Sequence, residues 1–72
     1  MPEMTPEELA LFEAHAVEEE STYALSILRP WVQSAHAIGH PPLTHLMEDT
    51  LQEAEEAARR AREEIERLQA AL

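Results

Sequence analysis

The sequence predicts an all-α fold in which two helices pack side by side as an antiparallel hairpin. Apolar residues recur at helical spacing along both halves of the chain, and the only glycine, closely followed by two prolines, lies between these halves. The 72 residues suffice for one domain and leave little room for a hydrophobic core. Residues 1–72 are therefore expected to form a single helical-hairpin domain.

The first helix is predicted over residues 6–38. Thr5 is a suitable N-cap, Pro6 suits the first helical position, and Glu8 completes a capping box with Thr5. One broad apolar face is formed by Leu9, Phe12, Ala16, Tyr23, Ala24, Ile27, Leu28, Trp31, Ala35 and Ile38. This face is wider than a contact between two helices requires, so the helix is expected to contact more than one neighbour.

Pro30 lies inside this pattern, where a proline removes a backbone hydrogen bond and kinks or splits a helix. Because the apolar spacing continues across Pro30, we expect one kinked helix. Gly39 is suited to cap its C-terminus, and the two following prolines favour a turn over residues 39–43.

The second helix is predicted over residues 44–72, with Thr44 as a candidate N-cap. Its apolar residues form an unbroken heptad pattern of Met47, Leu51, Ala54, Ala58, Ala61, Ile65, Leu68 and Leu72. We expect the large side chains of Tyr23, Ile27 and Trp31 to pack over the alanines. Leu11, Leu25 and Leu46 project outside the main faces and are expected to be exposed.

Two helices that pack against each other along a single line of contact, which we call the seam, rarely form a stable fold in a chain of this length. We therefore expect self-association, most simply of two hairpins into a dimeric four-helix bundle. The packing surfaces are expected to include Phe12, Tyr23, Ile27, Leu28, Trp31, Leu51, Ala54, Ala58, Ala61, Ile65 and Leu68.

The chain has 15 acidic residues, five arginines and a formal net charge of -10. Direct binding to nucleic acid is not expected, because it requires a basic surface. Arg29 is the only arginine, and no acid occurs, within residues 29–47. The acidic residues Glu13 and Glu18 to Glu20 are expected to lie beside the arginines of the second helix, which favours the antiparallel arrangement. Without cysteine, a basic leader or an apolar run of about 18 residues, the chain is expected to be a cytoplasmic protein that does not enter membranes.

His36, His40 and His45 are concentrated in the predicted turn region, where three imidazoles could bind zinc in a tetrahedral site. Zinc is the only cofactor that the sequence suggests. The favoured interpretation is structural and needs no cofactor: His36 complements the partial negative charge at the C-terminus of the first helix, while His40 and His45 are solvated.

Catalysis is not predicted, because cysteine, a glycine-rich phosphate loop and a convincing serine–histidine spacing are all missing from the sequence. The leading hypothesis is a self-associating module for protein–protein interaction or regulation, with a further partner that the sequence does not identify. One alternative is an acidic decoy that inhibits a nucleic-acid-binding protein. The other is a metal or small-anion binder that uses the histidine-rich end of the hairpin.

Overall fold

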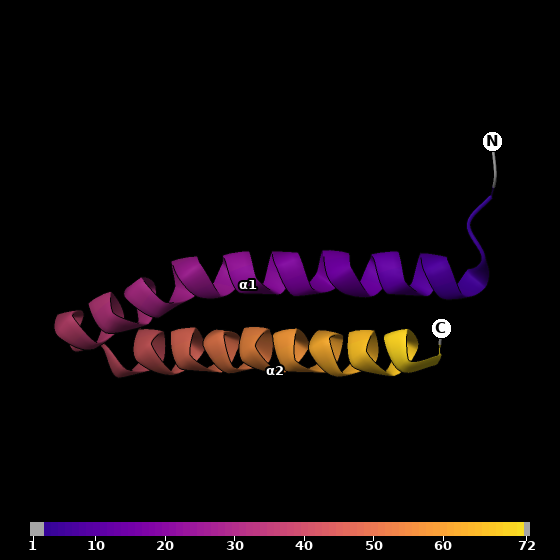
Figure 1. Ribbon diagram of the computed structural model, residues 1–72. Helices are drawn as coiled ribbons and strands as arrows, with labels where there is room; N and C mark the ends of the chain where they lie inside the picture. The colour runs from indigo at the N-terminus through magenta and orange to yellow at the C-terminus, as the bar shows by residue number, and fades with distance from the viewer. Residues whose placement is uncertain (1–2, 72) are drawn as a thin grey trace.

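The computed structural model describes residues 3–71 and consists of two long antiparallel helices, α1 (Pro6–Ile38) and α2 (Pro41–Ala71). The helices lie side by side along their length, and the termini lie at the same end of the hairpin (Figure 1). The molecule measures 53 × 24 × 15 Å. These features confirm the all-α hairpin predicted from the sequence.

Both ends of α1 form as the sequence predicts. The Thr5 side-chain oxygen accepts a hydrogen bond of 3.2 Å from the Glu8 N–H, and Pro6 is the first helical residue. At the other end, Gly39 adopts φ 74°, and its N–H donates to the carbonyls of Ala35 and His36. This left-handed conformation favours glycine because it has no Cβ.

Pro30 is accommodated inside α1, which remains a single helix from Pro6 to Ile38. The ribbon of α1 bends toward α2 over its last turns (Figure 1). A continuous helix with a bend agrees with the loss of one backbone hydrogen bond at proline. The bend also brings the last turns of α1 over the beginning of α2.

The connection between the helices is shorter than predicted, because α2 begins at Pro41 and not at residue 44. Proline is well tolerated at a first helical position. Thr44 does not cap α2: its hydroxyl lies 3.2 Å from the Ala35 carbonyl and 3.1 Å from the His40 carbonyl. The cap is instead His40, whose Nδ1 accepts a hydrogen bond of 3.3 Å from the Leu43 N–H.

The core between the helices is built mainly from small side chains. Its buried residues are Ala14, Ser21, Leu25, Ala35, Ala58, Ala61 and Ile65. The heptad pattern of α2 faces α1 as predicted, with Ala58 fully buried and Leu51, Ala54 and Leu68 half-buried. Leu72, the last member of that predicted pattern, lies outside the described residues.

The seam of α1 is not the one predicted from its sequence. Buried and half-buried residues follow a different heptad pattern: Leu11, Ala14, Glu18, Ser21, Leu25, Leu28, Val32 and Ala35. The expectation that Leu11 and Leu25 are exposed was therefore wrong, because Leu11 is half-buried and Leu25 is buried, whereas Leu46 is exposed as expected.

The large aromatic residues of α1 do not cover the alanines of α2. Phe12, Tyr23, Trp31 and Ile38 are 62%, 70%, 58% and 68% exposed, and Ile27 is half-buried. Packing of Tyr23 and Trp31 over the alanines was therefore a wrong prediction. Small residues on both helices allow the backbones to approach closely, and aromatic side chains between them would hold the helices apart.

Candidate functional site

An exposed row of large apolar side chains follows α1 outside the seam. We call this row the outer surface of α1; it consists of Leu9, Phe12, Tyr23, Trp31 and Ile38. A helix with two apolar faces normally buries both, one against each neighbour. In the hairpin only one face of α1 is covered, so the outer surface is the strongest candidate for an interaction site.

An apolar cleft lies at the closed end of the hairpin, where α1 bends over the start of α2. This tip cleft has a volume of about 310 Å³ and is lined by Trp31, Ser34, Ala35, Ile38, Leu43 and Met47. Apolar side chains form its walls, and Ser34 is its only polar residue. Because Trp31 and Ile38 belong to both features, the tip cleft is continuous with the outer surface of α1.

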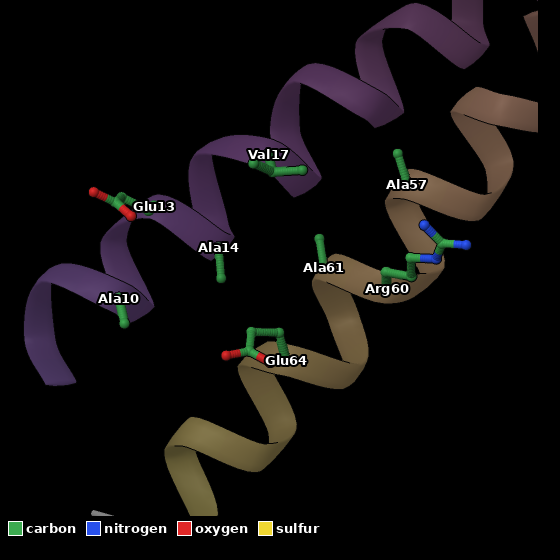
Figure 2. Close-up of a pocket in the computed structure, with 8 residues that line it drawn as sticks. All are labelled: Ala10, Glu13, Ala14, Val17, Ala57, Arg60, Ala61 and Glu64. Atoms are coloured by element: carbon green, nitrogen blue, oxygen red, sulfur yellow. The ribbon is translucent and has the colours of Figure 1, made fainter.

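A wider groove of about 520 Å³ lies between the helices nearer their open end. Figure 2 shows the small side chains of Ala14 and Ala61 directed into the space between the helices, while the Glu13 carboxylate turns away from α2. Its charged lining residues are Glu13 on α1 and Arg60 and Glu64 on α2. The groove follows from the shortage of large side chains along this part of the seam.

Three of the four arginines of α2 pair with carboxylates of the same helix. Among residues 3–71, their ion pairs are Arg59–Glu63, Arg60–Glu56 and Arg67–Glu64. The ion pairs predicted between α1 carboxylates and these arginines do not form. Carboxylates three or four residues away on α2 are neighbours of these arginines on the helix surface, and the three arginines pair with them instead.

Glu64 and Arg67 form the only pair with resolved pKa shifts among the described residues. A side-chain hydrogen bond from Arg67 is the main cause that lowers the pKa of Glu64 below its ordinary value of 4.5; desolvation opposes it, and the positive charge of Arg67 adds a lesser lowering. The same hydrogen bond and the negative charge of Glu64 raise the pKa of Arg67. Because the pair lies in solvent, its contribution to stability is small.

The histidines at the closed end have separate structural contacts. His36 Nε2 lies 2.7 Å from Glu48 Oε1 and thereby links α1 to α2, while His40 caps α2 and His45 is exposed. Over the described part of the chain, no group of three or more histidine or carboxylate side chains is arranged to hold a metal ion. His36, His40 and His45 therefore do not form such a group in the hairpin.

Comparisons with protein-family models, with curated proteins and with solved structures found no match to this chain. Within residues 3–71, neither helix combines the length and apolar character needed to cross a membrane. The interpretation of the site therefore depends on its own residues. What they offer chemically is apolar contact area, with aromatic side chains at Phe12, Tyr23 and Trp31.

Ser34 and Leu43 are the residues of the tip cleft that the sequence did not single out. Ser34 lies on the predicted apolar face of α1 but is polar, and Leu43 lies in the predicted turn. Because proline is favoured at the first helical position, Pro41 could have placed Leu43 inside the second helix and not in the turn.

Proposed function

We propose that this protein is a small helical interaction module that self-associates as a dimer through the outer surface of α1. The supporting observation is that small side chains form most of the core, whereas large apolar side chains lie on the surface. Among the described residues, Leu25 and Ile65 are the only large buried ones, whereas all three aromatic side chains are exposed. Aromatic side chains are enriched at protein–protein interfaces.

The amount of exposed surface supports the same proposal. The chain has an accessible surface of 5587 Å², whereas a monomeric protein of 8.2 kDa is expected to expose about 4,500 Å². The excess of about 1,000 Å² exceeds the roughly 800 Å² that each partner contributes to a standard interface. A second copy of the hairpin is therefore sufficient to cover the excess.

The simplest assembly is a twofold-symmetric dimer in which two hairpins form a four-helix bundle. The buried residues Ala58, Ala61 and Ile65 pack inside each hairpin in this arrangement, so they are not part of the contact between copies. The outer surface of α1 provides that contact.

Sedimentation velocity of the full chain over a range of micromolar concentrations tests the proposal. We expect a dimer that dissociates on dilution, and we expect Trp31→Ser to favour the monomer without loss of helix by far-UV circular dichroism. Leu46→Ser is the matched control, because Leu46 is equally exposed (61%) but lies on α2. The proposal would be contradicted if the unsubstituted chain were monomeric at every concentration, or if Trp31→Ser and Leu46→Ser weakened the dimer equally.

A further inference from the structure

We infer that the two copies pack antiparallel along α1, with Phe12 of each copy inserted into the tip cleft of the other and the twofold axis at Tyr23. This inference rests on the proposed self-association and specifies its geometry. It identifies the occupant of the tip cleft as an aromatic side chain of a second copy.

The positions of three residues define the arrangement. Phe12, Tyr23 and Ser34 are spaced eleven residues apart on α1, and eleven residues make close to three helical turns, so each lies within about 20° of the one before. Phe12 and Tyr23 are exposed, and Ser34 lines the tip cleft. A twofold axis at Tyr23 brings together residues equally far before and after it, so Phe12 meets Ser34 of the other copy.

The tip cleft is suited to a phenyl ring. Its volume of about 310 Å³ accommodates one aromatic side chain, and small Ser34 leaves space between Trp31 and Ile38. A phenyl ring in that space contacts the indole ring of Trp31, and aromatic pairs of this kind add to the stabilisation that burial provides. Phe12 itself is 62% exposed, so insertion removes apolar surface from water on both partners.

The distribution of charge favours the antiparallel orientation. Residues 21–47 contain no acidic residue and one arginine, Arg29, while the remainder of the chain contains all 15 acidic residues and four arginines. Parallel packing would align the two acidic halves, which repel each other. Antiparallel packing places each acidic half of α1 beside the acid-free part of the other copy.

Cysteine cross-linking of the full chain tests this geometry, because the sequence contains no cysteine. Under mild oxidation, Tyr23→Cys is expected to form a disulfide-linked dimer, since the two copies of residue 23 meet at the axis. Phe12→Cys alone and Ser34→Cys alone are expected to remain unlinked, because equivalent residues of the two copies are then about 33 Å apart along the helix axis. A mixture of these two variants is expected to link efficiently.

A substitution could weaken the dimer and so prevent cross-linking for a trivial reason. The mixed dimer controls for this, because both of its chains keep Tyr23 and one of its two contacts between Phe12 and the tip cleft is unchanged. Gln52→Cys, exposed on α2, measures cross-linking by random collision. Self-linking of Phe12→Cys as efficient as that of Tyr23→Cys would show parallel packing and overturn the inference, while leaving the proposed dimer standing. The inference would also be overturned if the mixture of Phe12→Cys and Ser34→Cys cross-linked no more efficiently than Gln52→Cys. If the unsubstituted chain sediments as a monomer at every concentration, the proposed function itself is contradicted.

The strength of the contact provides a second measurement. Phe12→Ala is expected to raise the Kd of the dimer at least about tenfold, as truncation of an aromatic anchor commonly does. Phe12→Leu keeps most of the apolar volume and is expected to change the Kd much less. Equal dimer affinity for Phe12→Ala and the unsubstituted chain, with helix content unchanged, would contradict the insertion of Phe12.

Discussion

Replacing Leu25 and Leu46 separately with alanine tests the seam of the hairpin, because the same change is made at a buried and at an exposed site. Leu25 is 5% exposed and Leu46 is 61% exposed. The substitution removes Cγ and both Cδ atoms, and at about 0.8 kcal/mol for each of these three buried carbons the loss at Leu25 is about 2.4 kcal/mol. An unfilled cavity adds to this value, so we expect a total of about 2.5 to 4 kcal/mol.

The corresponding loss at Leu46 is at most about 1 kcal/mol, because most of its side chain already lies in water. Urea unfolding monitored by far-UV circular dichroism, with all variants at the same protein concentration, measures both values. The common concentration keeps the contribution of self-association comparable. Equal losses for the two variants, or a larger loss for Leu46→Ala, would refute the assignment of Leu25 to the seam.

Three further predictions concern the cap, the charged pair and the net charge. His40→Ala is expected to lower the free energy of unfolding by about 0.5 to 2 kcal/mol, whereas His40→Asn retains a capping acceptor and is expected to cost less; urea unfolding compares them. Because the pKa of Glu64 is lowered on folding, its contribution to stability is present above the unfolded value and is lost as pH falls through the folded value. Thermal unfolding of Glu64→Gln across that acidic range should therefore show a slightly smaller loss than the unsubstituted chain, and an identical loss would argue against the Arg67 contact. Raising the salt concentration is expected to lower the Kd of the dimer in sedimentation, because each copy carries a net charge of -10 and salt screens the repulsion; salt-induced dissociation would contradict this expectation.

The sequence predicts the helices of this protein better than it predicts their packing. Thr5, Pro6 and Gly39 form the ends of α1 through local backbone interactions, which are readable from residue type. The face of α2 that packs on α1 is also readable, because its heptad pattern has no competitor on the same helix.

The seam of α1 was not predictable from hydrophobicity, because two faces of this helix compete. The face with Phe12, Tyr23 and Trp31 is the more apolar, whereas the actual seam includes Glu18 and Ser21. Close approach of the backbones selects small side chains, and this effect depends on both helices together.

The tip cleft was predictable only in part. Trp31 and Ile38 belong to the apolar face recognised in the sequence, but their meeting with Leu43 depends on the bend in the last turns of α1 and on the short connection between the helices. Helical periodicity does not specify either feature. Thr44 illustrates the same limit, because its hydroxyl bonds to Ala35 across the turn instead of capping its own helix.

Fluorescence of Trp31 tests the central claim most directly, because Trp31 is the only tryptophan and is 58% exposed in the isolated hairpin. Its emission spectrum and its quenching by acrylamide are measured over a dilution series of the unsubstituted chain. If a second copy covers the outer surface of α1, the emission shifts to shorter wavelength and quenching weakens as the concentration rises, in parallel with dimer formation in sedimentation. An emission spectrum typical of solvent-exposed indole at every concentration would contradict the account.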